Sequence, residues 1–140
     1  MSSSTTTSDS KVRILVVDDE PDILLTLNAV LSGHGHYVKT FDNPAEALSH
    51  LTSSEVTPYD LVITDYRMPG GISGLDLAKR VKEHTKRKTK VFLITAFDIS
   101  SLPEFGEALT SEIVDEIIQK PIPNDKLIAI IEKSFLHNNH

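Results

Sequence analysis

Several features are missing from this 140-residue chain, and each absence excludes a class of function. There is no cysteine, so disulfide bonds and thiolate metal sites are excluded. No apolar run reaches the roughly 18 residues that a membrane span requires. The polar start, residues 1–10, lacks the apolar core of a signal peptide. Positive charge is not in excess either: the net charge is −6, which argues against a general nucleic-acid binder.

The remaining composition is typical of one globular domain. Hydrophobic residues make up 39% of the chain, and its length allows a substantial core. We expect residues 1–10 to form a disordered polar tail, residues 11–137 the domain, and residues 138–140 a short C-terminal tail. With no span and no export signal in view, we expect a cytoplasmic protein.

Apolar runs and helix signals alternate along the chain. Strands are expected at about 12–17, 37–41, 61–64, 91–95 and 113–118, and helices at about 23–31, 44–51, 75–84, 102–109 and 125–136. Asn43-Pro44-Ala45-Glu46 is typical of a capped helix start. Strands that alternate with helices over short connections predict an α/β fold, with a five-stranded parallel sheet doubly wound by right-handed crossovers.

Polar side chains follow four of these strands, at the point where each strand ends. Asp18 and Asp19 follow the first strand, Asp65 the third, Thr95 closes the fourth, and Lys120 follows the fifth. Ligands of open parallel sheets bind beyond the carboxyl ends of the strands. Clustered carboxylates repel one another unless a cation shares them, and magnesium suits carboxylates combined with phosphate oxygens. The set therefore predicts a site for magnesium, or manganese, that also handles a phosphoryl group.

Each of these residues has an ordinary structural explanation when it is taken singly. The aspartates could start a helix or lie in a loop, the threonine could cap the next turn, and the lysine could be a solvated turn residue. Their joint occurrence, in order and each at the end of a strand, favours the functional interpretation.

The ordered set resembles the receiver domain of bacterial and archaeal response regulators. The pattern consists of Asp18-Asp19, Asp65-x-x-Met68-Pro69, Gly74, Thr95-Ala96 and Lys120-Pro121, within residues of about 12 to 136. The resemblance implies a flavodoxin-like (βα)5 fold with the strand order 2-1-3-4-5. It also implies a phosphoprotein of a two-component system that acts in phosphorelay signal transduction.

The same resemblance implies the roles of the acidic residues. Asp65 would accept a phosphoryl group from the phosphohistidine of a sensor histidine kinase, and it needs no general base because its carboxylate is ionised at pH 7. Asp19 would bind the divalent cation directly, Asp18 would bind it through water, and Arg67 would contribute its backbone carbonyl. Asp65 also belongs to the implied metal-binding set.

Two further residues would sense the phosphoryl group. Lys120 would pair with Asp65 and later with a phosphoryl oxygen, and Thr95 would turn to hydrogen-bond the group. The peptide bond between Lys120 and Pro121 would be cis.

The chain departs from the family where the signal is read out. The position three before the lysine usually carries an inward-rotating aromatic residue, and here it is Ile117. We expect the usual threonine-to-aromatic coupling to be altered, with Phe97 supplying part of it. The stretch 95–120 is also a few residues longer than usual, and Gly70-Gly71 adds one residue to the loop after the phosphoacceptor.

Arg67 and Phe97 occupy the two positions that usually tune loss of the phosphoryl group. An apolar Phe97 over the site would exclude the attacking water, and Arg67 would screen the phosphoryl charge. We therefore expect slow self-dephosphorylation.

These observations predict a stand-alone, single-domain response regulator that is not an enzyme acting on other substrates. Its partners would be a sensor histidine kinase and an output or phosphotransfer protein. We expect no direct contact with nucleic acid or membrane, and a monomer or weak homodimer. The alternatives are a receiver-like binding scaffold that phosphorylation does not control, and an aspartate-nucleophile phosphatase. The latter family usually has an Asp-x-Asp motif after its first strand, a spacing that Asp18-Asp19 lacks.

Half of the Lys and Arg residues lie in one segment. We expect a solvated helix end and turn there, because no aromatic residues that could stack on bases are interleaved. The segment comprises Lys79, Arg80, Lys82, Lys86, Arg87, Lys88 and Lys90.

Overall fold

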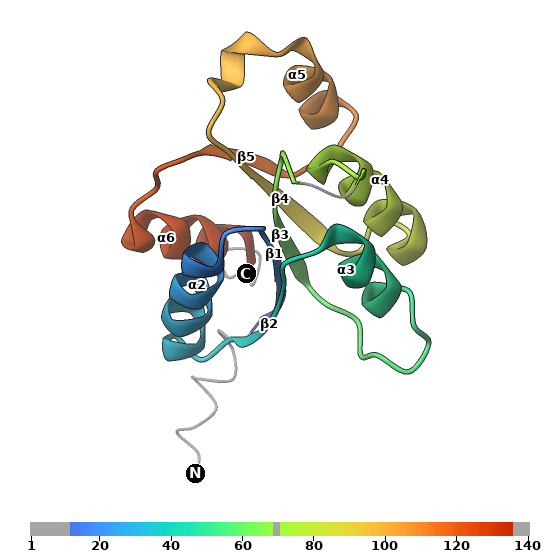
Figure 1. Cartoon of the computed structure of the whole chain (residues 1–140), viewed down its shortest axis with the longest axis vertical. Coiled ribbons are helices and arrows are strands. Elements are labelled where there is room, and N and C mark those ends of the chain that lie inside the picture. Colours follow the sequence, from blue (N-terminus) through green and yellow to red (C-terminus); the bar gives the residue numbers. More distant parts are fainter. Residues whose placement is uncertain (1–11, 69–70, 136–140) are drawn as a thin grey trace.

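The five strands form one parallel sheet in the order β2-β1-β3-β4-β5 (Figure 1). The structure is a computed structural model that describes residues 12–68 and 71–135. The expected tails and Gly70 lie outside these ranges. The strands are β1 (Arg13–Val17), β2 (Tyr37–Phe41), β3 (Leu61–Asp65), β4 (Lys90–Thr95) and β5 (Glu116–Gln119). The predicted sheet and its strand order are confirmed.

Helices cover both faces of the sheet (Figure 1). Helices α2 and α6 lie on one face, and α3, α4 and α5 lie on the other. Their bounds are α2 (Pro21–Gly33), α3 (Pro44–Leu51), α4 (Gly74–Thr85), α5 (Pro103–Thr110) and α6 (Asn124–Phe135), with a 3-10 turn, η1 (Ile99–Ser101), before α5. Among the described residues, none of the helices has the length and apolar character needed to cross a bilayer.

The apolar runs of the three central strands, β1, β3 and β4, are buried on both sides because successive side chains of a strand point to opposite faces. In β1, Leu15 and Val17 belong to the apolar cluster beneath α3, α4 and α5. Ile14 and Val16 belong to the second cluster, beneath α2 and α6. With both faces occupied by apolar contacts, polar chemistry is left to the ends of the strands.

The fifth strand begins later than the sequence predicts. We expected a strand over 113–118, but β5 spans Glu116–Gln119. Ile113 and Val114 instead donate backbone hydrogen bonds to Ala108 O, so they close the end of α5. Val114 belongs to the apolar cluster beneath α3, α4 and α5, and Ile113 packs against it. A sequence pattern does not distinguish such packing from the start of a strand. The other predicted boundaries agree with the structure within two residues.

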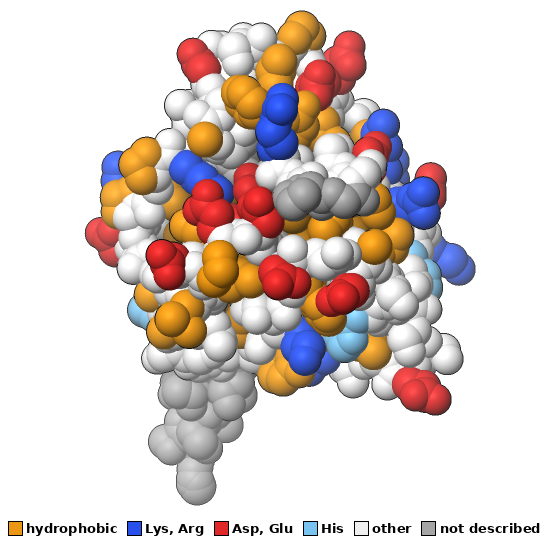
Figure 2. All heavy atoms as spheres, in the orientation of Figure 1, with side chains coloured by type: hydrophobic (Ala, Val, Ile, Leu, Met, Phe, Trp, Pro, Cys, Tyr) orange, Lys and Arg blue, Asp and Glu red, His pale blue; other side chains and the backbone are white. Residues whose placement is uncertain are grey.

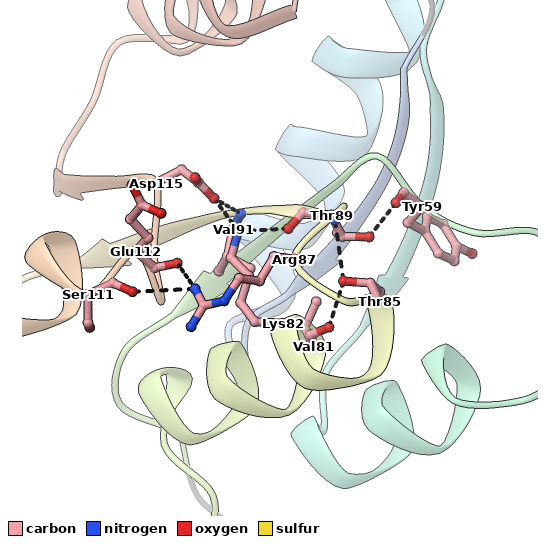
Figure 3. Close-up of polar contacts among 10 residues, drawn as sticks. All are labelled: Tyr59, Val81, Lys82, Thr85, Arg87, Thr89, Val91, Ser111, Glu112 and Asp115. Atoms are coloured by element: carbon pink, nitrogen blue, oxygen red, sulfur yellow. Dashed lines mark hydrogen bonds and ion pairs between the residues drawn. The ribbon is translucent and has the colours of Figure 1, made fainter.

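An ion pair between a buried lysine and a half-buried aspartate corrects the interpretation of the basic segment (Figure 3). Lys82 Nζ lies 2.7 Å from Asp115 Oδ2 and 2.9 Å from Thr89 O, and its side chain is only 6% exposed. Asp115 Oδ2 also accepts a hydrogen bond from Val91 N at 2.8 Å. Arg87 donates to the carbonyl oxygens at the end of α5. The prediction of a solvated segment is therefore wrong for Lys82, which ties α4 to β4 and to the turn before β5.

Helix α4 begins in close contact with the strand that carries Asp65. Ser73 and Asp76 form a complete capping box that sequence inspection missed, whereas the predicted Asn43 cap of α3 is confirmed. Gly74 N donates to Tyr66 O at 2.7 Å. A Cβ atom on Gly74 would lie 2.2 Å from Asp65 O, so only glycine fits there.

Replacement of Gly74 by alanine tests this close approach. We expect Gly74→Ala to lower the free energy of unfolding by about 3 kcal/mol or more, since the clash is with backbone and cannot relax by a rotamer change. Urea unfolding measures the change. Gly106→Ala is the matched control: a Cβ there meets nothing within 4 Å, and alanine in a helix is favoured by about 1 kcal/mol. Equal urea midpoints for Gly74→Ala and the unaltered protein would contradict the expectation.

Candidate functional site

The carboxyl ends of the strands bring the predicted site residues to one edge of the sheet. Asp18 follows β1, Asp65 ends β3, Thr95 ends β4, and Lys120 follows β5. Thr95 is in register with Gln119, the residue before Lys120. Near the middle of the face shown in Figure 2, acidic and basic side chains lie next to each other. Residues far apart in the chain therefore meet because parallel strands end together.

Three carboxylates form the centre of the site. Asp18, Asp19 and Asp65 each offer an oxygen, and these oxygens lie within 4.8 Å of one another. In the described ranges, this is the one group of three His, Cys, Asp or Glu side chains that could hold a metal ion. Asp18 and Asp65 are buried and Asp19 is exposed. An all-oxygen donor set that is open on one side fits magnesium or manganese, which keep waters and accept phosphate oxygens.

Lys120 lies between two of these carboxylates. Its Nζ atom is 3.2 Å from Asp18 Oδ2, where it donates a hydrogen bond, and 3.5 Å from Asp65 Oδ2. The sequence predicted the pairing with Asp65, and the additional hydrogen bond to Asp18 was not foreseen. The peptide bond from Lys120 to Pro121 is cis, as the family resemblance implied.

Burial and charge repulsion shift the protonation equilibria of the site. Burial raises the pKa of Asp65, the charge of Asp18 raises it further, and Lys120 opposes both. Burial also raises the pKa of Asp18, against the hydrogen bond that Glu20 N donates to it at 2.9 Å. For Lys120, burial alone would lower the pKa, but the two carboxylates outweigh it and raise the pKa. Keeping these carboxylates ionised therefore costs free energy, and a bound divalent cation would reduce that cost.

Thr95 is buried at the end of β4 and already has a structural contact. Its Oγ accepts a hydrogen bond from Phe97 N at 3.0 Å, so the threonine caps the turn that follows. The hydroxyl proton remains able to donate to another acceptor, since a hydroxyl both accepts and donates. The structural explanation of Thr95 and its predicted sensing role are therefore compatible.

The two tuning candidates lie against each other. The Arg67 guanidinium is 4.9 Å from the centre of the Phe97 ring, a cation–π arrangement. Both residues are exposed, with Phe97 at 37%. Ile117 is half-buried and packs against the apolar cluster beneath α3, α4 and α5. The roles of these three residues, including the backbone carbonyl of Arg67 as a ligand, remain predictions.

Sequence inspection missed Tyr66, which directly follows Asp65. Its ring makes edge-to-face contacts with Phe97 and Phe105, with centroids 5.8 Å and 4.9 Å apart. Its hydroxyl donates to the carboxylate of Glu104 on α5. The available signal was an aromatic residue next to the predicted phosphoacceptor, but its partners come from the distant segment 97–105.

Asp65→Asn tests whether the buried charge of Asp65 destabilises the folded protein in metal-free buffer. The pKa of Asp65 is raised in the folded chain, so the folded state binds more protons than the unfolded state between about pH 3.8 and the raised pKa. Asp65 therefore makes its full contribution to the stability of the fold below that window, and this contribution is lost as the pH rises through the window. We therefore expect Asp65→Asn to raise the thermal midpoint at pH 7, by an amount that shrinks as the pH falls through the window. A lower midpoint for the variant at pH 7 would contradict this.

Comparison with known proteins identifies the family. The family model for the response regulator receiver domain matches residues 14–132. The DNA-binding transcriptional regulator NtrC of Escherichia coli is 30% identical over 124 residues, which cover 89% of this chain and 25% of NtrC. This chain therefore spans about a quarter of the length of NtrC.

Solved structures agree with this match. The response regulator TrrA of Thermotoga maritima, solved in complex with Mg²⁺ and BeF, has 37% identity and a TM-score of 0.69, covering 87% of this chain and 97% of TrrA. A response regulator receiver domain protein of Clostridium thermocellum has 28% identity and a TM-score of 0.77, covering 91% of this chain and 96% of that chain. The fold is the flavodoxin-like receiver fold, and the chain belongs to the response regulator receiver domain family.

Proposed function

We propose that this protein signals by accepting a phosphoryl group on Asp65 from the phosphohistidine of a sensor histidine kinase. The observation that carries the proposal is the group of three carboxylates beside Lys120 at the carboxyl edge of the sheet. Asp18, Asp19, Asp65 and the carbonyl of Arg67 would hold magnesium or manganese. Receiver domains bind magnesium at such an acidic pocket, and the donor set present here fits that ion.

The transfer needs little covalent chemistry from the protein. A carboxylate oxygen of Asp65 attacks phosphorus, and the bond from phosphorus to the histidine nitrogen breaks with its electron pair left on the imidazole. When bound, the cation neutralises charge on the transferring group. Lys120 moves from the carboxylate to a phosphoryl oxygen, and Thr95 donates its hydroxyl proton to another phosphoryl oxygen. Catalysis is therefore mainly positioning and charge stabilisation.

The product of this step is a changed surface. Receiver domains interact with sensor kinases and output domains. We propose that this protein is cytoplasmic and that its partners are a sensor histidine kinase and an output or phosphotransfer protein. The net charge of −6 favours protein partners over nucleic acid. We further propose that the chain is a monomer or weak homodimer with no membrane contact, and that it turns over no substrate beyond its own phosphorylation and slow dephosphorylation.

The alternative is a receiver-like scaffold that works without phosphorylation. Such a scaffold has no need to keep three carboxylates and a lysine in contact, because burial and repulsion make them costly. The complete site therefore favours phosphorylation.

Acetyl phosphate with magnesium distinguishes the two functions. We expect the unaltered protein to gain one phosphoryl group that is labile to hydroxylamine, as an acyl phosphate is, and to lose this gain when the cation is chelated. Intact-protein mass measurement detects it. Asp65→Asn should stay unlabelled, whereas Asp125→Asn, an exposed aspartate in the first turn of α6, should label normally. Labelling of Asp65→Asn, or none in the unaltered protein, would contradict the proposal.

The rate at which the label is lost tests whether Phe97 shields the site from water. We expect a long-lived phosphoryl group, and a several-fold faster loss in Phe97→Ala because water reaches the site more easily. Leu109→Ala removes a similarly exposed apolar side chain on α5 and serves as the control, with an unchanged rate. A half-life of seconds in the unaltered protein, or equal rates with and without Phe97, would refute the idea.

A further inference from the structure

We propose that Tyr66 transmits the phosphorylation state of Asp65 to helix α5, and that its hydrogen bond to Glu104 is the contact that connects the two. This inference rests on the proposed function, since it concerns the readout of the same site. It replaces a route through Ile117, which has no polar atom in its side chain and lies half-buried in the apolar cluster.

The backbone of Tyr66 is held next to the site. Its N donates to Ile94 O at 2.9 Å, and its carbonyl accepts from Gly74 N at 2.7 Å. Tyr66 is therefore fixed between β4 and the start of α4, and it is covalently joined to Asp65. A change at Asp65 reaches this residue through a single peptide bond.

The side chain of Tyr66 contacts α5. Its hydroxyl donates to the carboxylate of Glu104 in the first turn of that helix. Its ring packs edge-to-face on Phe105, which is fully buried. The hydrogen bond to Glu104 raises the pKa of Tyr66, with burial adding to the effect, as expected for a phenol bound to a carboxylate.

A second route from the site arrives at the same ring. Phe97 N donates to Thr95 Oγ at 3.0 Å, and the Phe97 ring contacts the Tyr66 ring at 5.8 Å. If Thr95 turns toward a phosphoryl oxygen, the hydrogen bond that orients Phe97 weakens and the packing of Tyr66 changes. Asp65 and Thr95 thus both act on Tyr66, one through the chain and the other through Phe97.

Helix α5 is suited to respond to one contact. It spans Pro103–Thr110, has no side-chain cap at its start, and buries only Phe105 and Ala108. A helix of this length is marginal without tertiary contacts. Loss of the bond between Tyr66 and Glu104 would therefore loosen its first turn. Phosphorylation would release α5 from the resting position in which this bond holds it.

Hydrogen exchange of α5, measured with and without beryllofluoride and magnesium, tests the relay, because beryllofluoride mimics a phosphoryl group on a carboxylate. In the unaltered protein we expect amide exchange over residues 104–110 to become faster when the mimic binds. In Tyr66→Phe, which keeps the ring, exchange should be fast already and should not respond. Bound beryllofluoride is measured separately from its fluorine NMR signal.

Three variants of acidic residues on α5 sharpen the test. Glu104→Ala should behave like Tyr66→Phe, and Glu104→Gln should keep the response because its amide oxygen still accepts the hydrogen bond. Glu107→Ala, on the same helix, is the matched control and should respond like the unaltered protein. By the reciprocity of coupled equilibria, Tyr66→Phe should also bind beryllofluoride more tightly. A purely structural role for Tyr66 would leave that affinity unchanged or weaken it.

The failures of the two proposals are distinguishable. Suppose that beryllofluoride gives a bound fluorine signal and that α5 responds equally in Tyr66→Phe and in the unaltered protein. This result overturns the relay but leaves the phosphorylation of Asp65 standing. A fluorine signal in the unaltered protein without any response of α5 also overturns the relay alone. No fluorine signal in the unaltered protein overturns both.

Discussion

The rest of the site depends on the ion pairs that Lys120 forms with Asp18 and Asp65. Three carboxylates lie within 4.8 Å of one another, and two of them are buried, so the group is held against its own repulsion. The lysine offsets part of that repulsion from the side. A divalent cation can offset more, and this explains how one arrangement can favour both a metal ion and a transferring phosphoryl group.

The structure around Asp65 is built to hold that arrangement in place. Gly74 brings the start of α4 against the carbonyl of Asp65, at a distance that no larger residue allows. Lys82 and Asp115 fix the far end of the same helix to β4 and to the turn before β5. Helix α4 is therefore anchored at both ends, whereas the first turn of α5 has no side-chain cap. This difference is the reason why we propose that the first turn of α5 responds when the charge at Asp65 changes.

Much of the fold could be predicted because its signals are local. The apolar runs and the Asn43 cap are readable within a few residues, and they predicted the parallel sheet. The strand order was also correct, but it came from the family resemblance and not from a local signal. The prediction was wrong at 113–115, where Ile113 and Val114 hydrogen-bond the end of α5 and pack in the apolar cluster beneath α3, α4 and α5. It was also wrong for Lys82, whose partner Asp115 lies 33 residues away. Both errors arise from long-range contacts, which no local pattern contains.

The sequence by itself determined the identity and order of the residues that end the strands. It thereby indicated a carboxylate, hydroxyl and lysine site, because the strands of a parallel sheet present their carboxyl ends together. Only the tertiary structure decided that Lys120 bonds to Asp18 as well as facing Asp65, and that Tyr66 reaches Glu104. Side-chain partners depend on how helices pack over the sheet, and that packing is a property of the whole chain.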